Sequence, residues 1–223
     1  TSIDVRSALS TANRVVARSS SGVWGNANQG LNNTVYALAY TTSNLLYVGG
    51  AFTSAGSPRI AVNRIAKWDG TTWSTLGAGP GLHSTVLALA WAPNDHLFAG
   101  GLFTDVAGST AGTYSHIIEW TGTAWATLGA GVDDNVQVLA FDNSGNLYAG
   151  GLFHTAGGIP AVGHIAMWDG AWHTRGAAKG LNDIVKAIVV APDNSVYVGG
   201  NFTAVAGGTA GTCNYVAKWN GSV

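Results

Sequence analysis

The sequence predicts an all-β fold built from four repeats of about 50 residues. One phrase, with a hydrophobic run, a pair of glycines and two tryptophans, returns along the 223 residues. The glycine pairs begin at Gly49, Gly100, Gly150 and Gly199, at spacings of 51, 50 and 49 residues. No window of useful length shows the apolar period of a helix. A regular period of this length indicates an array of similar structural units.

Each repeat begins with a short, largely apolar run, which favours a strand that is covered on both faces. A turn rich in Asn, Asp and Ser follows, and a second strand then ends in the paired glycines, where another backbone must come close. The four first-strand runs are VYALAY at 35–40, VLALAW at 86–91, VQVLAF at 136–141 and VKAIVV at 185–190.

The second half of the repeat predicts a hairpin. A long loop of small residues leads to a third strand, which is IAKW at 65–68 in the first repeat. The dipeptides Asp69-Gly70 and Asp169-Gly170 then supply a turn with positive φ into a fourth strand around Trp73 and Trp172. We therefore expect four antiparallel strands in each full repeat.

The two ends of the chain predict how the array closes. Residues 1–12 have no counterpart in the repeat and are expected to be a lead-in to a single domain of residues 13–223. Residues 13–31 align with the second half of a repeat, whereas the last repeat stops after its third strand. We expect residues 22–27 to pair with residues 215–220, which would close a ring and bring Trp24 close to Trp219. An open arc completed by a second chain is the alternative.

Four-stranded units of this length are typical of the blades of a β-propeller, and four repeats predict four blades. The order of Gly-Gly, an aromatic residue near the end of the third strand and a later Trp resembles the kelch repeat. The fuller phrase, GGxFTxAG followed by IAxWDGxxWxxLGxG, is similar to the Rax2-type repeats of fungal and bacterial surface proteins. The resemblance covers residues 13–223. It departs from kelch blades at Trp68, Trp120, Trp168 and Trp219, where kelch blades usually carry Tyr.

Composition narrows the classes of partner. Only 9% of the residues are charged, the net charge is -1, and Lys and Arg form no run, which argues against nucleic acid and anionic membranes. No apolar run approaches the roughly 20 residues that span a bilayer. The single Cys213 excludes a disulfide framework within the chain and a zinc site with several cysteines. A surface of Gly, Ser, Thr and Asn favours an extracellular, cell-surface or virion-surface protein.

The residues predict no catalytic, metal or cofactor site. Eight of the nine tryptophans recur in register, which indicates packing between units more than sugar binding. The six histidines show no helical metal-site spacing, and no Gly-x-Ser-x-Gly phrase occurs. The turn at 142–146 lacks the carboxylates that calcium needs. We expect a protein that is not an enzyme.

Loop geometry predicts where a ligand would bind. Up-and-down strands place the second-to-third loops and the loops before each first strand on one face, and ligand sites concentrate on such loops. The expected function is a recognition or attachment module for a glycan or a protein surface, and the alternative is a structural domain of a fibre, capsid decoration or surface filament. Homo-oligomers are compatible with both. The same polar residues could instead cap strand ends. The candidate ligand-binding residues are Arg64, His83, His116, Asp133, Asp134, His164, Asp183 and Tyr215.

Overall fold

The computed structural model describes residues 25–77, 79, 81–106, 114–174, 180–205 and 213–219. Within these ranges the regular secondary structure consists of β-strands alone, which form four small antiparallel sheets and one two-stranded ribbon. The predicted all-β class is therefore confirmed. The described residues contain no helix that is long and apolar enough to cross a membrane.

The sheets follow one another along the chain, and each is formed by one repeat. In every sheet the strands lie in sequence order, with neighbours antiparallel. The first sheet contains β1 (Val35–Tyr40), β2 (Leu46–Gly50), β5 (Ile65–Trp68) and β6 (Trp73–Ser74), and its β2–β5 loop carries the ribbon of β3 (Ser54–Ala55) and β4 (Ile60–Ala61). The second contains β7 (Val86–Trp91), β8 (Leu97–Gly101), β9 (Ile117–Trp120) and β10 (Trp125–Thr127). The third contains β11 (Val136–Phe141), β12 (Leu147–Gly151), β13 (Ile165–Trp168) and β14 (Trp172–His173), and the fourth β15 (Val185–Val190), β16 (Val196–Gly200) and β17 (Val216–Trp219).

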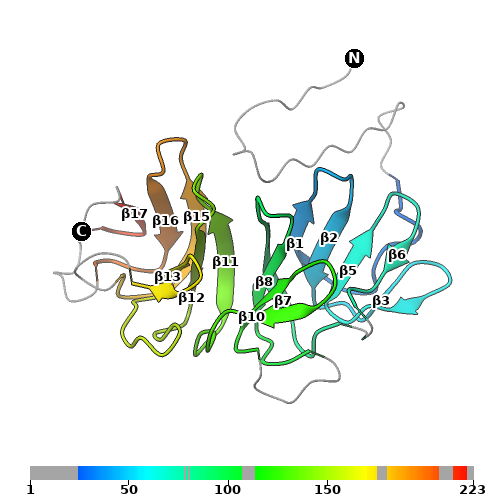
Figure 1. Ribbon diagram of the computed structural model, residues 1–223, viewed down its shortest axis with the longest axis horizontal. Coiled ribbons are helices and arrows are strands. Elements are labelled where there is room, and N and C mark those ends of the chain that lie inside the picture. The colour runs from blue at the N-terminus through cyan, green and yellow to red at the C-terminus, as the bar shows by residue number, and fades with distance from the viewer. Residues whose placement is uncertain are drawn as a thin grey trace.

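The first strands stack in series. Strand β1 packs against β7, β7 against β11 and β11 against β15, so the sheets succeed one another across Figure 1 from β6 on the right to β17 on the left. Within the described residues no packing of similar extent joins β15 back to β1. The structure therefore shows no closed ring. Trp24 lies outside the described residues, so the pairing of 22–27 with 215–220 stays a prediction.

The paired glycines are needed for two different close approaches. In the first sheet a Cβ on Gly50 would collide with the backbone carbonyl oxygen of Thr34 on the same sheet, which is the close approach that the sequence predicts. A Cβ on Gly49 would instead lie 2.5 Å from Cγ1 of Val86, a side chain of the next sheet. The pair thus lets β1 approach β2 and lets the second sheet pack onto the first.

The core lies mainly between successive sheets. Apolar clusters join the first sheet to the second, the second to the third and the third to the fourth. The phenylalanines that follow the glycine pairs, Phe52, Phe103, Phe153 and Phe202, are fully buried. Burial of this apolar area is the main favourable contribution to folding.

The tryptophans pair across the hairpin of the third and fourth strands. Trp68 opposes Trp73 in the strand register, and their ring centroids are 5.0 Å apart. The Trp120–Trp125 pair has a separation of 5.0 Å and the Trp168–Trp172 pair one of 5.4 Å. These six rings pack within their own sheets, which favours the structural interpretation of the repeated tryptophans.

Candidate functional site

The two kinds of loop that were expected to share a face do meet. In each repeat an isolated bridge joins a residue four positions before the first strand to the loop after the second strand. These loops carry the predicted ligand-binding residues. The bridges are Leu31–Ala55, Leu82–Val106, Val132–Ala156 and Leu181–Val205.

Asp133 fastens one loop of this face to another. Its Oδ1 accepts hydrogen bonds from the backbone N–H groups of His154 at 2.8 Å and Thr155 at 2.7 Å. Desolvation raises the pKa of the Asp133 carboxyl, but these hydrogen bonds outweigh it and leave the pKa below its ordinary value. Asn32 and Asn182 make the same pair of bonds in the first and fourth sheets. The contact is a repeated structural clamp.

The second sheet replaces this clamp by a different pair. His83 stands at the position of Asp133, and its Nδ1 contacts the carboxylate of Asp105. The Asp105 side chain is only 11% exposed, whereas that of His83 is 53% exposed. Asp134 and Asp183, one position later in their sheets, each accept a 2.6 Å hydrogen bond from the next backbone N–H. All these carboxylates serve local structure.

Four equivalent residues before the third strands adopt left-handed backbone conformations. Arg64, His116, His164 and Tyr215 have φ values of 65°, 63°, 64° and 65°. Each donates its backbone N–H to the carbonyl of the buried Phe of its own sheet and accepts from the second glycine of the pair. The conformation is unusual outside glycine, and its repetition in all four sheets assigns it to the architecture.

The side chains at these positions do different things. The guanidinium of Arg64 donates to the carbonyls of Ala51 at 3.1 Å and Phe52 at 3.2 Å. His116 Nδ1 lies 3.2 Å from the carbonyl oxygen of Gly101, and Tyr215 is 59% exposed.

His164 is the buried member of this set, with 6% of its surface exposed. Its ring packs edge to face against His154 at a centroid distance of 4.4 Å. Burial lowers the pKa of His164, and the neighbouring His154 lowers it further. His164 therefore contacts another histidine of its own repeat.

A pocket lies on the other face, between the second and third sheets. Its volume is about 560 Å³. Turns that join first to second strands and third to fourth strands form its walls. The lining includes the rings of Phe98, Phe141 and Trp168 and the polar side chains of Asn94, Glu119, Asn146 and Asp169.

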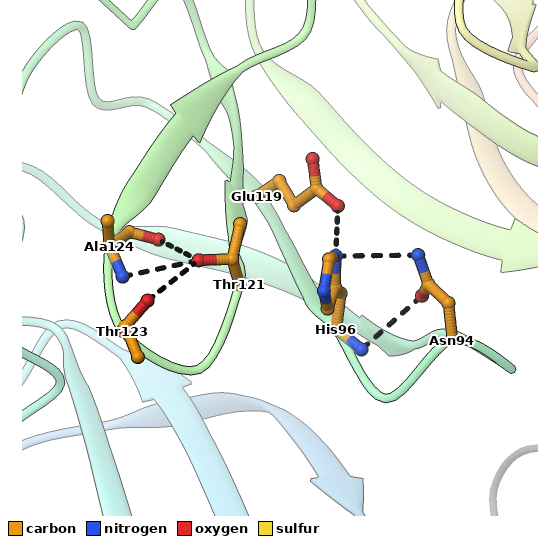
Figure 2. Close-up of polar contacts among 6 residues, drawn as sticks. All are labelled: Asn94, His96, Glu119, Thr121, Thr123 and Ala124. Atoms are coloured by element: carbon orange, nitrogen blue, oxygen red, sulfur yellow. Dashed lines mark hydrogen bonds and ion pairs between the residues drawn. The ribbon is translucent and has the colours of Figure 1, made fainter.

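Glu119 projects into this pocket from β9. Its Oε1 lies 2.5 Å from Nδ1 of His96, and Asn94 contacts the same imidazole from the β7–β8 turn (Figure 2). The two side chains are partly buried, with 19% of Glu119 and 31% of His96 exposed. His96 thus holds one carboxylate oxygen, and the other makes no hydrogen bond within the described part of the chain.

The sequence carries one signal for this pocket, which is not among the predicted ligand-binding residues. Glu119 is the only glutamate in the chain. The equivalent positions in the other third strands carry Lys67, Met167 and Lys218. The signal was an acid at a position that is basic or apolar in the other repeats.

The described residues contain no group of three or more His, Cys, Asp or Glu side chains that could hold a metal ion. In the turn considered for calcium, the Asp142 carboxylate accepts from the backbone N–H groups of Ser144 and Asn146 and from the Asn146 side chain. Its oxygens are used within the turn.

No family model matches the chain, and no curated protein matches it. Two solved structures of the extracellular domain of BT4673 from B. thetaiotaomicron resemble it, each with a TM-score of 0.51, at 16% and 15% identity. The matches cover 78% and 77% of this chain and 21% of each of those chains. PorZ, a surface component of the type-IX secretion system of Porphyromonas gingivalis, matches with a TM-score of 0.41 at 16% identity, over 74% of this chain and 24% of PorZ. The chain therefore spans about a fifth to a quarter of the length of these structures, and the BT4673 likeness shows the fold.

Proposed function

We propose that this chain is a non-enzymatic recognition module of an extracellular, cell or virion surface, and that it binds a glycan. The pocket beside Glu119 carries the proposal. Its volume of about 560 Å³ falls within the range of roughly 300–1,000 Å³ that small-molecule sites occupy. The composition of the surface and the extracellular origin of the BT4673 domain support the location.

The pocket has the two kinds of surface that a sugar ring needs. The partly exposed rings of Phe141 and Trp168 offer apolar area for the C–H face of a pyranose, and the buried Phe98 supports Phe141 from behind. The Glu119 carboxylate accepts hydrogen bonds from sugar hydroxyls, and the Asn94 amide both donates and accepts. Phe98 and Phe141 meet edge to face at 5.3 Å, so the apolar wall bridges two sheets.

We further propose that the four sheets are blades of a kelch-like or Rax2-like propeller. The series of sheets, each of three or four antiparallel strands, supports this architecture. In it, the pocket lies between neighbouring blades on the face opposite the predicted ligand-binding residues. Loops at the ends of rigid strands are common places for recognition.

The test is a glycan array with four purified variants. Glu119→Gln removes the charged acceptor of the pocket, and we expect binding to fall about 10-fold or more, since a hydrogen bond to a charged group contributes about 1.5–3 kcal/mol. Asn94→Ala removes a neutral polar group and should weaken binding less. Asp95→Asn is the matched control, because it replaces a carboxylate by an amide in the exposed β7–β8 turn beside Asn94, outside the pocket lining. Tyr215→Ala tests the predicted face. If the wild type binds no glycan on the array, or if Tyr215→Ala is the only substitution that abolishes binding, the proposed glycan pocket is wrong.

A structural role is the second candidate function, in a fibre, a capsid decoration or a surface filament. It is favoured by large apolar side chains at the two ends of the array. Val35, Leu38, Val189 and Val216 are 40%, 46%, 61% and 64% exposed. Assembly of the purified chain into multimers would support this role.

A further inference from the structure

The three junctions between successive sheets have the same construction. In each, a Val and a Leu or Ile of a first strand pack beside the first glycine of the preceding sheet. Val86 and Leu89 approach Gly49 in this way at the first junction. A register shift between Val86 and Ala88 forms a bulge, which allows residues three positions apart to face the same neighbour. Val136 with Leu139 at Gly100, and Val185 with Ile188 at Gly150, repeat the arrangement.

A ring and an isoleucine complete each junction. Tyr47 of the first sheet stacks on Trp91 of the second at 5.4 Å, and Phe98 of the second meets Phe141 of the third at 5.3 Å. The isoleucines that open the third strands, Ile65, Ile117 and Ile165, are 0%, 1% and 6% exposed. The preceding sheet therefore contributes Gly, an aromatic ring and Ile, and the following sheet contributes Val, Leu or Ile, and usually a second ring.

The first sheet carries the residues that a following sheet contributes to a junction, but no sheet among the described residues packs against them. We call Val35, Leu38 and Tyr40 the head face. Val35 and Leu38 are 40% and 46% exposed, whereas the equivalent Val86 and Leu89 are 0% and 6% exposed. The difference is the cover that a preceding sheet provides.

The fourth sheet presents the complementary side. We call Val189, Tyr197, Gly199 and Val216 the tail face. Tyr197 is 37% exposed and Val216 is 64% exposed, although their equivalents in the other sheets are buried. Among the described residues a Cβ on Gly199 would meet nothing closer than 3.7 Å, so no described side chain takes the place that Val86 takes at Gly49. One chain thus carries both halves of the junction.

We propose that the head face of one copy of this chain docks on the tail face of a second copy. Val35 and Leu38 then take the place beside Gly199 of the other copy, and Tyr40 packs on its Tyr197. The contact would pair the same kinds of side chain that pair at the three junctions inside the chain, so the two faces are expected to fit each other. It is heterologous, since different patches meet, and it closes into a ring or propagates. The proposal does not depend on a bound glycan.

The test is the mass of the purified chain in solution, by light scattering and sedimentation over a concentration series. We expect whole multiples of 22.7 kDa, beginning with the dimer. Leu38→Glu on the head face and Gly199→Val on the tail face should each give monomers. Both should fold, because Leu38 is exposed and a Cβ at Gly199 is unobstructed. Thr123→Glu and Gly25→Val are matched controls that change exposed positions elsewhere and should still associate.

A mixture of the two variants gives the sharper result. Leu38→Glu keeps an intact tail face and Gly199→Val keeps an intact head face, so together they should form a dimer that neither forms alone. A wild type that stays monomeric would overturn the proposal. So would a monomer in which both substitutions lower the thermal midpoint, since that result means that the two faces meet within one chain. Association unaffected by either substitution would also contradict it.

Discussion

Tyr47 and Trp91 stack across the first junction, with ring centroids 5.4 Å apart and planes inclined by 17°. Tyr47 is 5% exposed, and burial raises the pKa of its phenol. At the second junction the corresponding pair, Phe98 and Phe141, is inclined by 73°. The same backbone spacing therefore accepts both stacked and edge-to-face rings, which are alternative favourable geometries of aromatic pairs. The glycine beside each pair, by contrast, cannot be replaced by a larger residue without a collision.

Gly49→Ala should destabilise the monomer, whereas Gly199→Ala should leave the stability of the monomer nearly unchanged. The new Cβ at residue 49 would lie 2.5 Å from Cγ1 of Val86, which is fully buried and cannot retreat. Overpacking of this kind costs about 1–3 kcal/mol. The two substitutions restrict the unfolded chain equally, so urea denaturation of both isolates the effect of the junction. Equal midpoints would contradict the packing described here.

Trp172→Phe should cost more than Trp73→Phe. Each change deletes an indole N–H that donates at 2.8 Å to a backbone carbonyl, of Leu128 and Ala27 respectively. Leu128 is fully buried, so its carbonyl would lose its partner at a cost of about 1–3 kcal/mol. Ala27 is exposed, so water can replace the indole. Thermal denaturation of the pair of variants measures the difference, and the reverse order would refute this account.

Asp133→Asn should remove part of the acid sensitivity and leave stability at neutral pH almost unchanged. Asn32 and Asn182 make the same two backbone bonds in other sheets, so the amide can replace the carboxylate. The folded pKa of Asp133 lies below the ordinary value of 3.8, so its contribution is present above that pH. It is lost as the pH falls from there through the folded pKa. Asp133→Ala, which deletes the bonds, should lose stability at every pH.

His164 should make the protein less stable as the solution becomes mildly acidic. Burial and His154 hold the pKa of His164 below the ordinary value of 6.5, so the folded state favours the neutral ring. The resulting stability is present above that value and is lost as the pH falls through the folded pKa. His164→Asn should flatten the pH dependence of the thermal midpoint between about pH 7.5 and about pH 5. Asn also tolerates the φ of 64° at this position.

The chain should not hydrolyse broad chromogenic glycosides. His96 and the Glu119 carboxylate are held together, but the pocket is proposed to bind and release its ligand unchanged. Steady-state assays of the wild type and of Glu119→Gln at matched concentration check this expectation. Turnover by the wild type that Glu119→Gln abolishes would show an enzyme.

The sequence predicted the all-β class because strand signals do not depend on distant residues. The glycine pairs also predicted close backbone approach, which Gly50 and Thr34 confirm. Closure could not be predicted in the same way, since it depends on the angle between successive sheets. A period of about 50 residues does not encode that angle.

The candidate site was harder to predict, because structural and binding roles use the same residue types. Asp133 has the composition of a ligand-binding residue, yet its Oδ1 holds two backbone N–H groups of a neighbouring loop. Whether it also binds a ligand stays a prediction. The pocket at Glu119 is formed by ordinary turn residues of two sheets, which only the packing of β7 on β11 brings together.

The exchange of the Asp133-type clamp for the His83–Asp105 pair determines how repeats can be transplanted. Each clamp links a residue three positions ahead of a first strand to a loop about 22 positions later in the same repeat. A chimera cut between them would place two hydrogen-bond acceptors, or two mismatched side chains, opposite each other. The smallest portable cassette therefore starts before the clamp, near Leu82 for the second repeat, and ends before Val132. A repeat cut at those limits keeps both partners of its clamp when it is moved into a new array, so only its contacts with the neighbouring sheets must be matched.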